Sequence, residues 1–158
     1  MIDQQSILDA YQFRHACKEF DPTRKISVED FAFILETGRL SPSSFGYEPW
    51  RFLVIQDSAW RERLKAVTWG AQKQLPSASH YLALLVHRGG MRPDGEHVQH
   101  MMQDIHRFTP ERIAGRTAVY TRFQDSDFRL GDDRALFDWS CKQAHIALGN
   151  MMTSAAMI

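Results

Sequence analysis

The segment 132–158 constrains the fold more than any other stretch of the chain. Its apolar residues leave little polar surface on a helix of that length: Leu136, Trp139, Ala144, Ile146, Ala147, Leu148, Met151, Met152, Ala155 and Ala156. A helix that is apolar over most of its circumference belongs in a protein core or in a subunit interface. We therefore expect a long core helix over this segment.

Strand patterns are scarce in the same chain. Residues 52–55 and 81–86 are short apolar runs rich in β-forming residues, and we expect both to be buried strands. Independently stable sheets usually have three or more strands. The apolar helix also reaches Ile158 without a Gly, Asn or basic residue to close it. We therefore expect that further strands and part of the functional site are absent from this sequence or are supplied by another chain.

Helices are expected over much of the remaining chain. Ser27 and Asp30 form a capping box ahead of apolar residues at helical spacing, and Asp57 is suited to cap another helix. The predicted helices cover residues 2–13, 27–40, 58–67, 96–107 and 110–123, with a polar break over 70–76.

Length and charge restrict the class of protein. A chain of 158 residues has the size of one domain, and we expect a single domain over 1–158. Its 19 basic and 19 acidic residues cancel, which gives no basic footprint for nucleic acid or for a membrane surface. Without a signal peptide or an apolar run of about 20 residues, a cytoplasmic protein is expected. Cys17 and Cys141 are too few for a disulfide framework.

Two stretches have the composition of a ligand site. Residues 40–50 contain two prolines, two adjacent serines and a glycine, which predicts a loop that presents backbone N–H and hydroxyl groups. Arg14, His15 and Lys18 place three potential cations close together. The alternative is that Arg14 and Lys18 form a solvated helix end that stabilises the last carbonyls.

The histidines allow a metal site or an ordinary structural role. His97, His100 and His106 could be metal ligands, but no Cys or matched acidic partner accompanies them, so a solvated helix face is favoured. His80 and His87 flank a predicted strand, where bonding to backbone groups is the commoner role. No metal site is predicted.

Four motifs in order are similar to segments of a known family. RHACKEFD at 14–21 and SPSSFGYEPWRF at 41–52, with a helix between them, resemble the opening of the FMN-dependent nitroreductase family. SASH at 77–80 and WSCKQ at 139–143 lie where that family has comparable segments. The resemblance implies an α+β protein with a nitroreductase-like fold, in which helices flank a central mixed β-sheet. It also implies a homodimer with a long core helix at the interface and FMN bound there.

The resemblance also implies which residues contact FMN. These are Arg14, His15, Ala16, Lys18, Pro42, Ser43, Ser44, Gly46, Gln72 and Gln74. The cations would meet the phosphate and the N1 to O2 edge of the flavin, where positive charge stabilises the reduced ring. The Pro-Ser-Ser residues would come from the other subunit, and either glutamine would replace a side-chain amide. Ala16 stands where serine is common, and Gly46 where many members have asparagine.

The implied activity is that of an NAD(P)H oxidoreductase. It would reduce nitroaromatics, quinones or flavins by hydride transfer through flavin N5, so no side chain is assigned as catalytic. Tyr120 and Phe123 are candidates for a lid over a flat substrate, the alternative being that both are core residues. Family members continue past the long helix with further flavin-binding segments. The second hypothesis is therefore a flavin-free interaction protein that keeps the dimer fold.

Overall fold

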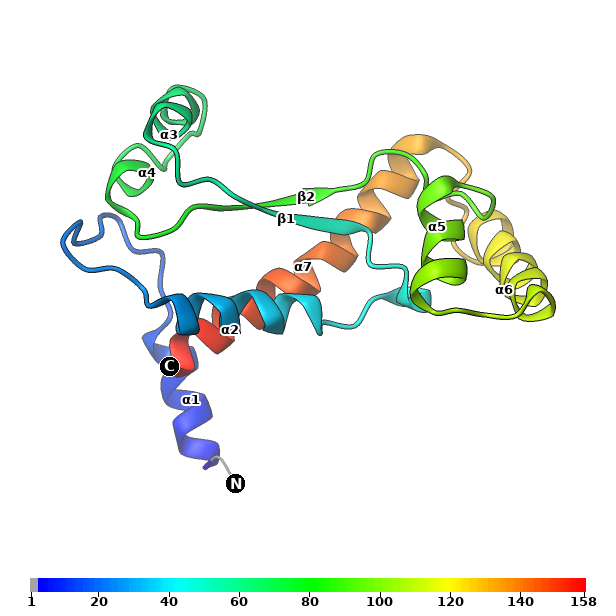
Figure 1. Ribbon diagram of the computed structural model, residues 1–158, viewed down its shortest axis with the longest axis horizontal. Coiled ribbons are helices and arrows are strands. Elements are labelled where there is room, and N and C mark those ends of the chain that lie inside the picture. The colour runs from blue at the N-terminus through cyan, green and yellow to red at the C-terminus, as the bar shows by residue number, and fades with distance from the viewer. Residues whose placement is uncertain (1–2) are drawn as a thin grey trace. The chain divides into compact units, whose positions relative to one another are not determined.

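The computed structural model describes residues 3–158 (Figure 1). Its elements are α1 (Gln4–Phe13), α2 (Val28–Arg39), η1 (Ser44–Gly46), β1 (Trp50–Val54), α3 (Ser58–Lys65), α4 (Gln74–Ser77), β2 (Leu82–Val86), α5 (Glu96–His100), η2 (Met101–Ile105), α6 (Pro110–Arg122), η3 (Phe123–Asp127) and α7 (Asp133–Met157). The α+β class is confirmed. The expected helix start at residue 2 lies outside the described residues.

Contacts within the chain define two compact units. The first unit contains the described residues up to Ser41, together with Phe52–Leu84 and Ala147–Ile158. The second unit contains Pro42–Arg51 and Leu85–Ile146. Both strands and α7 therefore have residues in each unit. A single domain over 1–158 stays a prediction.

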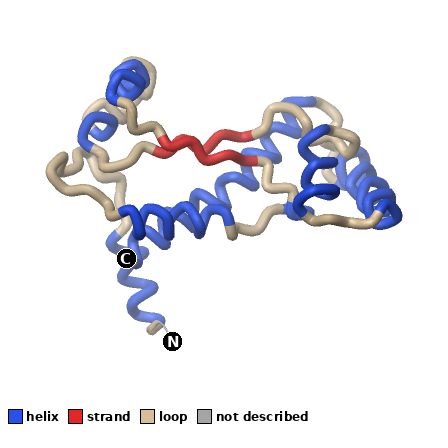
Figure 2. The backbone as a smooth tube through the Cα atoms, in the orientation of Figure 1, coloured by secondary structure: helices blue, strands red, loops and turns tan. Residues whose placement is uncertain are grey.

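The two predicted strands form an antiparallel pair (Figure 2). The expectation that both are buried is wrong, because Leu53, Val54 and Leu85 are exposed. At one end the Ile55 N–H donates to the Tyr81 carbonyl over 2.8 Å, and at the other the His87 N–H donates to the Pro49 carbonyl over 3.0 Å. Within residues 3–158 the sheet has these two strands alone. It is smaller than the central mixed sheet that the family resemblance implies.

Side-chain caps begin the predicted helices where the sequence indicates. The Asp30 N–H donates to Ser27 Oγ at the start of α2 over 2.9 Å. The Trp60 N–H likewise donates to Asp57 Oδ1 at the start of α3 over 2.8 Å. These bonds satisfy backbone donors that a helix start otherwise leaves without partners.

Two helices end differently from the prediction. The predicted helix 96–107 is α5 followed by the π-helical turn η2, and the predicted helix 110–123 is α6 followed by the π-helical turn η3. A π turn bonds residue i to i+5 and admits one extra residue per turn. Hydrophobic spacing does not reveal such turns, because they depend on what each helix end packs against.

The core of the second unit is formed by apolar residues from several helices and the loops between them. Its buried members are Tyr47, Met91, Val98, Met101, Met102, Tyr120, Leu130, Leu136 and Trp139. The Tyr47 hydroxyl lies 3.4 Å from Met102 Sδ inside this cluster. Burial of a Tyr ring contributes on the order of 2 kcal/mol to stability. The ring thus anchors the loop before β1 to this unit.

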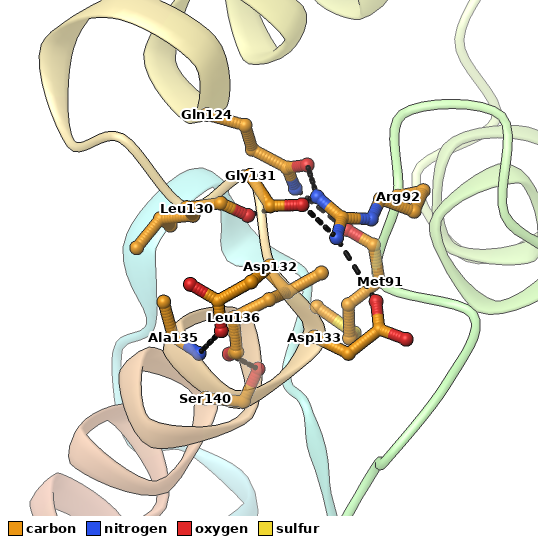
Figure 3. A network of polar contacts seen from close by, with 10 residues as sticks. All are labelled: Met91, Arg92, Gln124, Leu130, Gly131, Asp132, Asp133, Ala135, Leu136 and Ser140. Atoms are coloured by element: carbon orange, nitrogen blue, oxygen red, sulfur yellow. Dashed lines mark hydrogen bonds and ion pairs between the residues drawn. The ribbon is translucent and has the colours of Figure 1, made fainter.

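A polar network fixes the start of α7 in the same unit (Figure 3). The Arg92 guanidinium donates to the Leu130 and Gly131 carbonyls, each over 2.9 Å, and to Asp133 Oδ1 over 3.0 Å. Asp132 Oδ1 accepts a backbone N–H of the first helical turn over 2.8 Å. The predicted long helix therefore begins where its acidic start indicates.

No helix within residues 3–158 is long and apolar enough to cross a membrane.

In the first unit a glycine allows two helices to approach closely. A Cβ on Gly38 of α2 would lie 2.6 Å from Met151 Sδ of α7 and 2.8 Å from the Phe52 ring. Both distances are shorter than carbon atoms tolerate. The absence of a side chain at this position is therefore a requirement of the packing.

We expect Gly38→Ala to lower the free energy of unfolding by about 1–3 kcal/mol, since the new methyl overpacks this contact. Denaturation by urea, followed by circular dichroism, measures the change. Gly115→Ala is the matched control, because a Cβ at Gly115 in α6 meets nothing within 4 Å. There alanine should stabilise the helix by up to about 1 kcal/mol. Equal effects of the two variants would contradict the packing argument.

Candidate functional site

Arg14 is held in the first unit with part of its guanidinium unused. It follows the last residue of α1, and its backbone N–H closes that helix on the Ala10 carbonyl. Nη1 donates to Thr153 Oγ1 of α7 over 2.9 Å, and the guanidinium lies 4.5 Å from the centre of the Tyr11 ring. Nε is buried and has no hydrogen-bond partner among the described residues. A buried donor without a partner is costly and marks a place where an acceptor could bind.

His15, Ala16 and Lys18 follow Arg14 on the surface of the first unit. All three are exposed. His15 Nδ1 donates to the Phe13 carbonyl over 2.9 Å. Within the described part of the chain, Lys18 makes no hydrogen bond or ion pair. The segment therefore has cationic groups on the surface of the first unit. The alternative was that Arg14 stabilises the last carbonyls of its own helix, but its guanidinium bonds Thr153 of α7.

The two candidate glutamines differ in what they bond. Gln74 Nε2 donates to the Cys17 carbonyl over 3.0 Å, so this residue lies against the segment that carries the cations. Gln72 is exposed and donates to the Thr68 carbonyl over 3.1 Å. The structure thus brings Gln74 to the basic segment, whereas the amide of Gln72 bonds the turn that precedes it.

The loop of residues 42–49 belongs to the second unit and is bonded internally. Ser43 Oγ accepts the Glu48 N–H over 2.9 Å, so the hydroxyl hydrogen is left to donate. The Ser44 N–H donates to Gln143 Oε1 over 2.9 Å. The expectation that this loop offers free backbone N–H groups is therefore wrong for Ser44, because its N–H donates to the Gln143 side chain of α7. Pro42 is exposed and both serines are half-buried.

The backbone of this loop is strained. Phe45, Gly46 and Glu48 have φ values of 62°, 72° and 43°. Only glycine adopts such values without a steric penalty, and each other residue pays about 1–3 kcal/mol. The surrounding contacts therefore have to hold the loop in this conformation.

Three consecutive carbonyls of the loop accept hydrogen bonds from the helices of the second unit. Arg116 Nη2 donates to the Phe45 carbonyl over 3.3 Å. His106 Nε2 donates to the Gly46 carbonyl over 2.9 Å, and His97 Nε2 to the Tyr47 carbonyl over 2.6 Å. A carbonyl only accepts, so both histidines carry a hydrogen on Nε2.

These bonds correct the expectation of a solvated histidine face. His97 and His106 are half-buried and bond to the loop, because it approaches that side of the helical segment. His100 is exposed and pairs with Asp104 over 2.7 Å, as a solvated position would. Sequence spacing groups the three residues together, whereas the loop contacts two of them.

His87 lies against His97 beside this loop. The two rings are 4.0 Å apart between centres and tilted by 31°. The pKa of His87 is lowered, chiefly by burial and then by the positive charges of His97 and Arg51. The folded protein therefore favours neutral His87.

Tyr120 and Phe123 are packed among aromatic side chains of the second unit. Tyr120 has no exposed surface, and burial raises its pKa to about 12. Phe123 is half-buried, with its ring centre 4.5 Å from that of Phe128 and 5.6 Å from that of Trp139. The packing of Tyr120 agrees with the alternative that it is a core residue. A lid role for these residues stays a prediction.

A cavity of about 510 Å³ lies beside the loop in the second unit. Residues on its wall include Ser44, Phe123, Phe128, Trp139, Lys142 and Gln143. Two residues predicted for different roles, Ser44 for the cofactor and Phe123 for the substrate, thus line one space. Its aromatic walls suit a flat molecule.

Solved structures of other proteins share this fold. A Bacillus subtilis protein described as a nitroreductase matches with a TM-score of 0.76 and 17% identity, over 98% of this chain and 72% of that one. An Exiguobacterium sibiricum protein of the same description, solved in complex with FMN, matches with a TM-score of 0.69 and 22% identity, over 99% and 71%. The chain therefore has a nitroreductase-like fold.

Sequence relatives identify the family. A Staphylococcus aureus protein named as an NAD(P)H nitroreductase is 53% identical over 155 residues, which cover 98% of this chain and 69% of the relative. A Bacillus subtilis protein of the same name is 50% identical over 154 residues, which cover 96% and 70%. The profile of the nitroreductase family matches residues 11–158. The chain belongs to the nitroreductase family, and it is an oxidoreductase.

We expect stability to decrease as the pH falls below about 6.5, the ordinary pKa of an unfolded histidine. Above that pH both states hold neutral His87, and its contribution is complete. Below it the unfolded chain takes up a proton that folded His87 resists, until the pH reaches the lowered folded pKa. Urea unfolding at a series of pH values from about 7.5 to 5 measures this trend.

His87→Gln is the control for that prediction, because it removes the titrating group. His80, whose pKa is lowered chiefly by burial, titrates in both proteins, so the difference between them reports His87. The variant should lose less stability over the same pH range. An equal loss in both proteins would show that His87 is not responsible.

Proposed function

We propose that this chain is an FMN-dependent NAD(P)H oxidoreductase that reduces nitroaromatics, quinones or flavins. The observation that carries the proposal is the basic segment of the first unit. It combines a buried Arg14 Nε without a partner among the described residues with an exposed Lys18. The names of the sequence relatives and the FMN in the Exiguobacterium sibiricum structure support this cofactor and co-substrate.

The donor groups of this segment fit the phosphate and ring edge of FMN. Arg14 offers Nε to an acceptor while Thr153 and Tyr11 hold the rest of its side chain in place. A guanidinium held in this way loses less conformational freedom on binding than a mobile one. Lys18 adds a second positive charge. Gln74 is the better candidate of the two glutamines, because its side chain already lies on the backbone of this segment.

FMN, when bound, would supply the hydride chemistry between NAD(P)H and the acceptor at flavin N5. The side chains of this protein would bind and orient. Arg14 and Lys18 would stabilise negative charge on the cofactor, and Ser43 would donate its hydroxyl hydrogen. The aromatic wall at Phe123 would cover a flat acceptor.

We further propose that the active form is a cytoplasmic homodimer in which the loop of one subunit completes the site of the other. In the first unit, α7 leaves Leu148, Met152 and Met157 exposed, by 38%, 51% and 42%. Apolar side chains at this density on a helix favour contact with another chain. The family resemblance supplies the form of that contact.

We expect the double substitution of Arg14→Ala and Lys18→Ala to weaken FMN binding at least tenfold. Charge-assisted hydrogen bonds contribute about 1.5–3 kcal/mol each, which corresponds to a factor of ten or more. Titration of the apoprotein with FMN, followed by quenching of flavin fluorescence, gives the dissociation constant. The control is Arg63→Ala with Arg122→Ala, which removes the same charge from exposed helix positions.

The unmodified protein decides between the two hypotheses. A yellow protein whose flavin absorbance is bleached by NADH or NADPH supports the oxidoreductase. A colourless protein that takes up no added FMN would overturn the proposal and favour the flavin-free interaction protein. Equal affinities in the double variant and its control would show that the cations are misplaced.

A further inference from the structure

The loop of residues 42–49 is held by side chains for which the proposed function gives no role. His97 comes from α5, His106 follows η2, and Arg116 lies in α6. Each donates to a different carbonyl in an unbroken row, that of Phe45, Gly46 and Tyr47. We call these three donors the carbonyl clamp.

The clamp acts on the conformation of the loop, whereas another contact attaches the loop to the second unit. Tyr47 is fully buried in the core, and its hydroxyl reaches Met102. That attachment does not depend on where the neighbouring carbonyls point. The three donors bond the carbonyl sides of the peptide groups between Phe45 and Tyr47, while the Gly46 and Tyr47 N–H groups bond the Ser43 and Ser44 carbonyls over 3.0 and 3.5 Å. Together these bonds set the direction of each peptide group.

The need for such a clamp follows from the backbone. Phe45 and Glu48 have positive φ values although neither is glycine, and Gly46 has a φ of 72°. A Cβ on Gly46 would lie 3.3 Å from His106 Nε2, so the imidazole also closes the space beside this residue. A strained turn persists only where its surroundings over-determine it.

The conformation that the clamp holds places polar groups of two serines. Ser43 Oγ accepts the Glu48 N–H, which leaves its hydrogen to donate, and Ser44 lines the cavity beside Phe123. Rotation of the peptide groups after Ser44 would move Glu48 and release Ser43. The direction of the serine hydroxyls thus depends on the carbonyls that follow them.

We propose that His97, His106 and Arg116 are positioning residues that hold this loop in the conformation able to bind the flavin. The inference rests on the proposed function, because it assigns a ligand to the loop. It adds that the imidazole Nε2–H groups determine flavin affinity without contacting the cofactor. Loss of these donors should loosen the loop, even though Tyr47 remains buried.

The test compares a variant that lacks the two imidazole donors with one that keeps them. His97→Leu with His106→Leu removes both N–H groups and keeps apolar bulk. His97→Gln with His106→Gln retains an amide N–H near the position of each Nε2. Hydrogen exchange of the apoprotein, read by mass spectrometry over residues 42–50, reports the loop. Fluorescence titration with FMN reports affinity, and thermal melting reports overall stability.

We expect the leucine pair to exchange faster over the loop than the unmodified protein and to bind FMN roughly tenfold more weakly, as the loss of two neutral hydrogen bonds implies. The glutamine pair should restore both. If the histidines had a purely structural role, the leucine pair would have a lower melting temperature. Any change in loop exchange or FMN affinity would then not be reversed in the glutamine pair. If the leucine pair fails to fold, Arg116→Met against Arg116→Lys makes the same comparison at the third donor.

Each outcome bears on one claim. Unchanged loop exchange in the leucine pair would overturn the clamp. Faster exchange with unchanged FMN affinity would overturn the positioning role while leaving the proposed function intact. Failure of the unmodified protein to bind FMN would overturn the proposed function and with it the flavin as ligand, and the exchange data would then still decide whether the clamp holds the loop.

Discussion

Burial of the apolar surface of α7 is the constraint on which both units depend. In the second unit this helix supplies Leu136 and Trp139 to the core, and its start is fixed by Arg92. In the first unit its later residue Met151 packs against Gly38. One helix therefore supplies apolar surface to two cores. A two-stranded sheet is marginally stable without packing partners, and Phe52 of β1 contributes its ring to the same contact at Gly38.

Once the helices are packed, buried backbone groups decide where polar side chains lie. The loop before β1 carries consecutive carbonyls that water cannot fully reach, and such groups need donors. His97 and His106 satisfy two of them, while Gln143 takes the Ser44 N–H. The result is a loop whose shape depends on side chains from α5, α6, α7 and the turn after η2. Its serines can be rigid only because other residues hold the backbone.

The sequence predicts those parts of the fold that have local causes. The start of α2 follows from Ser27 and Asp30, which are neighbours in the chain, and α7 follows from a continuous apolar pattern. The roles of His97 and His106 have no local signal, because their partners lie 50 and 60 residues away. For the site, Arg14 and Lys18 stand out by composition, whereas the hold of Thr153 on Arg14 crosses 139 residues.

Some of the groups that lack partners inside the described chain point to a common explanation, which does not extend to Arg116 Nε and the Tyr120 hydroxyl, both buried without a partner in the second unit. Arg14 Nε is buried without an acceptor, Ser43 keeps a hydrogen to donate, and Leu148 and Met152 are exposed on α7. Unpaired polar groups and exposed apolar groups both cost free energy, and a chain retains them where something else covers them. A homodimer that carries FMN, as proposed, would cover both kinds, since the anion pairs with the donors and the second subunit covers the helix. In that assembly the loop whose carbonyls bond His97, His106 and Arg116 would lie at the cofactor of the other subunit.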